Sequence, residues 1–419
     1  MIKGTKWRKV VVAGTALMAI LATLLPASIA QAEVKKLTIN VNQSPWLNTY
    51  KKLVLDYTKE TGIEVDVRVF PYTEMRPTLV TDIQSNNRTY DVYQYDELFT
   101  HEFANNKWVK PFNQIEPGFK VDPNVGSYGN FMYWNAAKKF SDPKGEVMSM
   151  PLNGNTNVFL YRKDIYADLG LKVPTTWDEV TAAAKKIKAK YPNVYPIAIP
   201  LGSEEAQGEF AIWAGGNGGR YFDDASKKWV INSKANVETL KYLTSLVKAG
   251  LTQPSPASTN RTDAFKLFSQ GKVGMINASV FFPSTLKDYK SKVDYGVAPF
   301  PHSPKGKSIT LGVQDYFMAF KKPGNEAAVK AWLNFLFKPD NYAGFLKATG
   351  GFIPATKSAS TAVDSSLLPF INQLPNAIFY PGDLAAWPKV AGTLATQVGT
   401  GVIYDAKGVL DKIQKVAVA

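Results

Sequence analysis

Polar and aromatic residues follow the expected β-strands of this sequence at their carboxyl ends. Strands expected near 36–42, 91–95 and 273–276 lead into amide, hydroxyl, carboxyl and aromatic side chains. In an open α/β sheet, ligands bind beyond the carboxyl ends of the strands. The candidate ligand-binding residues from this and similar positions are Asn42, Gln43, Tyr72, Tyr95, Asp96, Asn153, Asn155, Trp213, Asn277, Ser279, Phe281, Gln314, Asp315, Tyr316, Tyr380 and Trp387.

These residue types together are suited to binding a sugar. The C–H faces of a sugar stack on aromatic rings, which by analogy with aromatic pairs contributes on the order of 1 kcal/mol beyond burial. Sugar hydroxyls need donors and acceptors, since an unpaired buried polar group costs about 1 to 3 kcal/mol. Trp213 and Trp387 are the leading stacking candidates. The alternative is that the aromatics pack in the core and the short polar residues cap helices or form turns.

The sequence lacks the residues that several kinds of enzyme require. It has no cysteine, which excludes disulfides, thiolate metal sites and a cysteine nucleophile, and its only histidines are His101 and His302. It contains neither H-E-x-x-H nor G-x-S-x-G, and "GGNGG" at 215–219 is not followed by the Lys-Ser/Thr of a phosphate loop. We therefore expect no catalytic residue, no metal site and no cofactor. A glycosidase with two distant carboxylates leaves no sequence motif and stays open as an alternative.

Local patterns predict the elements that position the candidate residues. A helix at 263–270 should end at Gly271, which can adopt the left-handed conformation, and a short buried strand follows it. Thr176 and Glu179 form the pattern of a capping box at the start of a helix. Trp177 lies inside that helix, and we expect it to pack within the second half of the protein.

Three segments resemble one known family. "AFKLFSQGKVGMINAS" is similar to the helix-Gly-Lys-strand signature of the family 1 extracellular solute-binding proteins of ABC importers, the maltose-binding-protein-like group. "VMSMPLNGNTNVFLYRKDIYADLGLKVPTTWDEVTAAAKKI" resembles that family's central segment, and "SITLGVQDYFMAFKKPGNEAAVKAWLNFLF" resembles a later one. Where the family usually has a glycine, this chain has Asn106 and Lys107. The resemblance covers nearly all of residues 33–419.

The resemblance implies an α/β protein with the two-lobe, type II periplasmic binding fold. Each lobe would be a β-sheet flanked by helices, with the ligand cleft at the hinge. By analogy, residues 33–151 and 299–345 form the N-terminal lobe, and residues 152–298 and 346–419 form the C-terminal lobe. Trp387 corresponds to an aromatic residue in the family's cleft, and Asp96 occupies a position that the family often uses to bind sugar hydroxyls.

Residues 1–32 have the pattern of a cleavable signal peptide. Four basic residues precede an apolar run from Val10 to Leu25, and Ala30-Gln31-Ala32 is an A-x-A cleavage site. The alternative is an uncleaved anchor, although the run is shorter than the roughly 20 residues that span a bilayer. Removal of this segment lowers the formal net charge from +14 to +10. Without a cysteine for lipidation, we expect a periplasmic protein.

The resemblance also implies the partners. We expect a monomer that binds a small carbohydrate and delivers it to the transmembrane permease subunits of an ABC importer. The basic residues are spread along helices, which argues against nucleic acid as a partner. An anionic solute, such as a uronate oligosaccharide or a phosphate ester, stays open because Lys163, Arg220 or Arg261 could face the cleft.

Overall fold

The first half of the chain builds a five-stranded sheet in the order β2-β1-β3-β15-β6. The structure is a computed structural model, and it describes residues 36–44, 46–125, 131–139, 141–202, 205–223, 225–313, 315–319, 322–349, 352–356, 363–379, 387–403 and 405–418. The signal peptide that the sequence predicts at 1–32 therefore lies outside the described residues. The strands of the sheet are β1 (Lys36–Asn42), β2 (Glu64–Phe70), β3 (Val92–Asp96), β6 (Met150–Pro151) and β15 (Asp315–Ala319).

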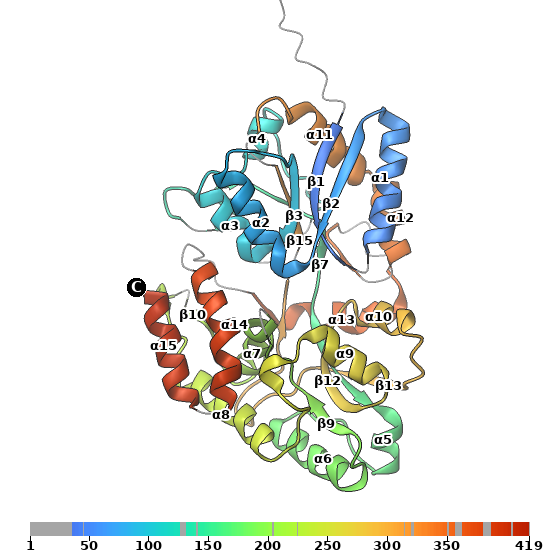
Figure 1. Ribbon diagram of the computed structural model, residues 1–419, viewed down its shortest axis with the longest axis vertical. Coiled ribbons are helices and arrows are strands. Elements are labelled where there is room, and N and C mark those ends of the chain that lie inside the picture. The colour runs from blue at the N-terminus through green and yellow to red at the C-terminus, as the bar shows by residue number, and fades with distance from the viewer. Residues whose placement is uncertain are drawn as a thin grey trace, which may run out of the picture. The chain divides into compact units, whose positions relative to one another are not determined.

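Helices cover both faces of this first sheet. Figure 1 shows α1, α11 and α12 on one side of the strands and α2 and α3 on the other. Tyr50 and Tyr57 of α1 are fully buried and pack edge-on against Trp332 of α11. The helices are α1 (Leu47–Thr61), α2 (Tyr72–Gln84), α3 (Glu97–Asn105), α4 (Phe112–Ile115), α11 (Glu326–Leu336) and α12 (Pro339–Thr349), and β4 (Tyr133–Trp134) pairs with β5 (Glu146–Val147).

A second sheet has the strand order β13-β8-β12-β9. Its strands are β8 (Asn157–Arg162), β9 (Tyr195–Ala198), β12 (Val273–Ser279) and β13 (Tyr295–Ala298). The surrounding elements are α5 (Lys163–Asp168), α6 (Trp177–Lys190), α7 (Glu205–Gly215), α8 (Lys234–Lys248), α9 (Arg261–Ser269), α10 (Phe282–Asp288), α13 (Leu368–Ile371), α14 (Trp387–Ile403), α15 (Ala406–Val418) and the pair β10 (Phe222–Asp223) with β11 (Lys228–Trp229).

The local predictions for this second half are confirmed. Thr176 accepts a hydrogen bond from the Glu179 backbone N–H at 3.3 Å, and the Glu179 carboxylate accepts one from the Thr176 N–H at 3.0 Å, so the capping box is complete. Gly271 follows α9 with φ of +74°, as a left-handed stop requires. Trp177 is buried and stacks on Tyr242 with 4.5 Å between ring centroids.

The chain crosses between the two sheets at short paired segments. β7 (Asn153–Gly154) pairs with β16 (Ile353–Pro354), and β14 (Thr310–Leu311) pairs with β17 (Ala377–Ile378). The first crossing follows Pro151, the last residue of β6, where the sequence predicts a change of lobe.

The second change of lobe, predicted at residue 299, lies later in the chain. Trp177 donates its backbone N–H to His302, and Ser303 donates its own to Gly216, so this segment still belongs with the second sheet. The chain joins the first sheet only at Asp315, where β15 begins. The boundary at 299 was wrong because proline and glycine marked a turn there, whereas the contacts that hold the segment come from distant residues.

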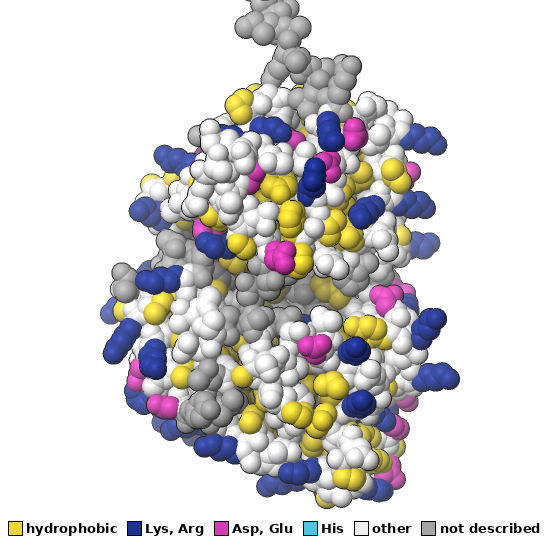
Figure 2. All heavy atoms as spheres, in the orientation of Figure 1, with side chains coloured by type: hydrophobic (Ala, Val, Ile, Leu, Met, Phe, Trp, Pro, Cys, Tyr) yellow, Lys and Arg dark blue, Asp and Glu magenta, His cyan; other side chains and the backbone are white. Residues whose placement is uncertain are grey.

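Charged side chains lie over the surface of both halves without forming one basic stripe on the face shown in Figure 2. This agrees with the spread of lysines along the helices in the sequence. In the part of the chain that the structure describes, no helix is long and apolar enough to span a membrane.

Candidate functional site

Seven of the candidate residues lie at one edge of the first sheet. β1 and β3 run parallel and end at Asn42 and Asp96, and β15 runs antiparallel with Asp315 opposite Asp96. The members at this edge are Asn42, Gln43, Tyr72, Tyr95, Asp96, Asp315 and Tyr316. The structure describes the side chains of Asn42 and Gln43 but not those of the other five, and Gln314 lies outside the described residues.

Amide groups at this edge are only partly paired. Gln94 is fully buried, and its Oε1 accepts the Asn42 backbone N–H at 3.0 Å. The Asn42 Oδ1 and the Gln94 Nε2 are buried and have no hydrogen-bond partner among the described residues. Because buried polar atoms are nearly always paired in folded proteins, these two mark a place where a polar molecule can bind. Gln94 was not among the candidates, although it lies two residues before Asp96 on the same face of β3.

At the matching edge of the second sheet lie Asn277 and Ser279, near the end of β12. Both side chains are buried, and Ser279 pairs with Asn157, the first residue of β8. The Asn277 Nδ2 donates to the Glu209 carboxylate of α7 at 2.7 Å, whereas the Asn277 Oδ1 and the Asn157 Nδ2 have no partner in the described part of the chain. This edge therefore repeats the pattern of the first sheet.

Three further candidates surround the crossing segments. The backbone of Asn155 pairs with Val313, and its Oδ1 accepts the Val280 N–H at 3.2 Å. Asn153 is buried in β7, opposite Pro354. Phe281 is half-buried, with its ring edge-on to Phe352 at 5.3 Å. The structure thus brings these residues together between the two sheets.

Trp213 does not fit the role of an open stacking platform. Its side chain is only 1% exposed, and its ring packs against Phe300 at 4.8 Å and Tyr242 at 5.8 Å. Its indole N–H donates to Glu209 Oε1 at 2.9 Å. The structure therefore places Trp213 in the core of the second lobe, the alternative that large aromatics usually follow. Trp387 is the first residue of α14, but its side chain is not described, and Tyr380 lies outside the described residues.

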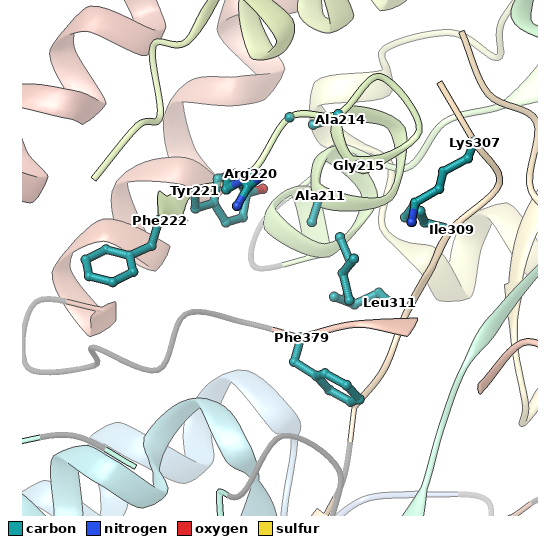
Figure 3. Close-up of a pocket in the computed structure, with 13 residues that line it drawn as sticks. Ala211, Ala214, Gly215, Arg220, Tyr221, Phe222, Lys307, Ile309, Leu311 and Phe379 are labelled. Carbon is teal, nitrogen blue, oxygen red and sulfur yellow. The ribbon is translucent and has the colours of Figure 1, made fainter. Parts of the chain in front are cut away.

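A pocket of about 410 Å³ lies beside α7, and Figure 3 shows the side chains that line it. Its described lining comes from α7, the glycine-rich turn after it, the segment at 307–311 and the end of β17. These residues are Ala211, Ala214, Gly215, Gly218, Gly219, Arg220, Tyr221, Phe222, Lys307, Ile309, Leu311, Ile378 and Phe379. The pocket contains none of the sixteen candidates, and Arg220 is the one lining residue that the sequence analysis had considered.

The described residues offer no metal site. No group of three or more histidine, aspartate or glutamate side chains in the described part of the chain lies close enough to hold an ion. Of the three cations considered for an anionic solute, Lys163 is exposed and 3.2 Å from Asp294, and Arg261 begins α9. Arg220 lines the pocket.

Comparison with solved structures defines the class of fold. A maltose-bound T. maritima protein superposes with a TM-score of 0.78 at 21% identity, covering 91% of this chain and 98% of that chain. An ABC substrate-binding protein from Listeria monocytogenes in complex with cycloalternan gives 0.77 at 20% identity, covering 91% and 97%. The predicted two-lobe periplasmic binding fold is therefore confirmed.

Comparison of sequences establishes the family. The model of the bacterial extracellular solute-binding proteins matches residues 42–343, and the chain belongs to this family. A binding protein of Brucella abortus (strain 2308), whose name states no solute, is 27% identical and is matched over 99% of this chain and 97% of its own length. A multiple sugar-binding protein of Streptococcus mutans is 24% identical over 71% of this chain and 70% of its own length. An sn-glycerol-3-phosphate-binding periplasmic protein of Rhizobium meliloti is 29% identical over 52% of each chain.

Proposed function

We propose that this protein is the periplasmic substrate-binding component of an ABC importer and that its solute is a carbohydrate. The main support is the set of buried amide atoms that lack partners at the edges of both sheets, on Asn42, Gln94, Asn157 and Asn277. Neutral donors and acceptors of this kind match sugar hydroxyls, because each pairing avoids an unsatisfied buried group. The sugars named for several structural relatives support the same choice.

The sugar binds between the edges of the two sheets and stabilises the form in which both lobes contact it. The crossing segments at β7, β14 and β16 supply the hinge about which the lobes close. Closure depends on the ligand having a higher affinity for the closed form than for the open form. The importer's permease subunits then recognise the closed form. The candidates at both edges, with Trp387 as the stacking aromatic, are the proposed contacts.

The protein works without turnover of its ligand and reaches the periplasm through a signal peptide cleaved after Ala32. Neither a catalytic group nor a cofactor takes part in this proposal. A glycosidase would hydrolyse the bound sugar, so chromatography of the sugar recovered after incubation separates the two functions. An intact sugar agrees with a binding protein, and its hydrolysis products would contradict one.

The decisive experiment is a thermal-shift screen of residues 33–419 against neutral and acidic oligosaccharides. A ligand that binds only the folded state raises the melting temperature by mass action. The variant Asn155→Ala should lower the shift given by the best sugar, whereas Tyr289→Ala, at the exposed end of α10, should leave it unchanged. If no sugar raises the melting temperature, or if both variants behave alike, the assignment fails.

A further inference from the structure

The pocket beside α7 has walls that suit carbon rather than sugar hydroxyls. Aliphatic side chains from α7, from the segment at 309–311 and from β17 form most of it, and two phenylalanines complete it. Among the described lining residues, Tyr221 alone carries a neutral hydrogen-bonding side chain, and its hydroxyl already donates to the Gln207 carbonyl. A sugar in this pocket would leave its hydroxyl groups unpaired. The pocket therefore calls for a different ligand from the sheet edges.

Glycines of the "GGNGG" turn shape the pocket. A Cβ on Gly215 would lie 2.8 Å from Ile309 Cδ1 and 2.9 Å from Ile378 Cδ1, so only glycine allows these side chains to approach α7. Gly218 has φ of +76°, which turns the chain back beneath the helix. This turn, which did not fit a phosphate loop, thus serves to bring apolar side chains around one space.

Two cations lie at the pocket. Lys307 and Arg220 come from separate segments, and both side chains are exposed. Lys307 forms no ion pair with a described residue, and Arg220 is 3.2 Å from Asp223, which does not line the pocket. No described lining residue is acidic. The electrostatic field at the pocket therefore favours an anion.

We propose that this pocket binds a small amphipathic carboxylate, with its hydrocarbon body against the apolar walls and its carboxylate near Lys307 and Arg220. The volume of about 410 Å³ lies within the usual range of small-molecule sites, roughly 300 to 1,000 Å³. The site is distinct from the carbohydrate site, since it shares no residue with the sheet edges. It rests on this pocket alone and does not depend on the identity of the transported solute.

Calorimetric titration of residues 33–419 with octanoate tests the proposal, with octanamide as the neutral control of the same length. We expect octanoate to bind and octanamide to bind roughly tenfold more weakly, because the amide cannot pair with the two cations. The double variant Arg220→Gln/Lys307→Gln should weaken octanoate binding by a similar factor. Lys305→Gln is the matched control, since Lys305 is exposed two residues from Lys307 and does not line the pocket.

A second variant tests the location. Ala211→Leu adds bulk inside the pocket, and we expect it to abolish octanoate binding while circular dichroism and the melting temperature verify folding. Absence of octanoate binding, equal binding of octanamide, equal losses in Lys305→Gln, or undiminished binding by folded Ala211→Leu would each overturn the proposal. Sugar binding measured on the same samples should persist in every variant, so failure here is separable from failure of the carbohydrate assignment.

Discussion

Asn277 of β12 donates a hydrogen bond to the carboxylate of Glu209 on α7 at 2.7 Å, and both side chains are buried. The same carboxylate accepts the indole N–H of Trp213 at 2.9 Å. A strand end, a helix and an aromatic core residue are thus joined through one buried acid. This arrangement gives Asn277 a structural role in addition to its proposed contact with sugar.

The first prediction separates these two roles of Asn277. Asn277→Ala should lower the free energy of unfolding by about 1 to 3 kcal/mol, because Glu209 loses a buried donor. Urea denaturation of the sugar-free protein measures this loss. If stability is unchanged while sugar affinity falls, Asn277 acts only through the ligand, and the structural role is wrong.

The second prediction concerns the two tryptophans proposed for stacking. Trp213→Ala should lower the free energy of unfolding by about 3 to 5 kcal/mol, as expected for removal of a large buried aromatic. Trp387→Ala should instead weaken sugar binding by on the order of 1 kcal/mol, about fivefold in Kd. Denaturation and calorimetry on each variant provide the two readouts. A stable Trp213→Ala protein with weakened sugar binding would return Trp213 to the ligand site.

Local patterns predicted much of this fold because their causes lie within a few residues. The Thr176–Glu179 capping box and the stop at Gly271 depend on neighbours three or four positions away. The strand that ends at Asp96 was likewise predicted from its own pattern of residues. Each of these features needs no information about distant segments.

Features that depend on tertiary contacts could not be predicted from the sequence. Trp213 is buried because Phe300 and Tyr242, far from it in sequence, pack on its ring. The pocket forms where Leu311 and Ile378 are brought together by the β14–β17 pair. Neither residue carries a chemical signature of its own, so no motif in the sequence could point to the pocket.

The third prediction is a loss of stability in mild acid caused by His101. The side chain is buried beside Phe131 and Trp134, and desolvation lowers its pKa from 6.5 to about 3. Below pH 6.5 the unfolded chain binds a proton that the folded protein does not, so stability falls as the pH falls towards 3. The cost is about 1.4 kcal/mol per pH unit, or about 2 kcal/mol at pH 5.

The measurement for His101 compares denaturant unfolding of the wild type and His101→Leu between pH 7 and pH 5. Carboxylates titrate in both proteins, so the difference between the two curves isolates the histidine. The gap in unfolding free energy should change in favour of the variant as the pH falls. Parallel curves would show that His101 becomes protonated in the folded state.

The fourth prediction tests how closely the hinge strand and the segment after β17 are packed. A Cβ on Gly312 would lie 2.4 Å from Cε1 of Phe379, while the Gly312 N–H donates to the Ile378 carbonyl at 2.8 Å. Phe379 also contacts Phe131 of the first lobe, with 6.2 Å between ring centroids. Gly312→Ala should therefore displace the ring and lower the free energy of unfolding by about 1 to 3 kcal/mol.

The matched test of Gly312 is a double-mutant cycle with Phe379→Ala. Without the ring, the added methyl group has room, so the cost of Gly312→Ala should fall to nearly zero in the Phe379→Ala background. Urea denaturation of the four proteins gives the coupling energy directly. Additive losses would mean that Gly312 is required for its backbone and not for the approach of Phe379. In that case the contact between the crossing strand and the first lobe would not depend on this glycine.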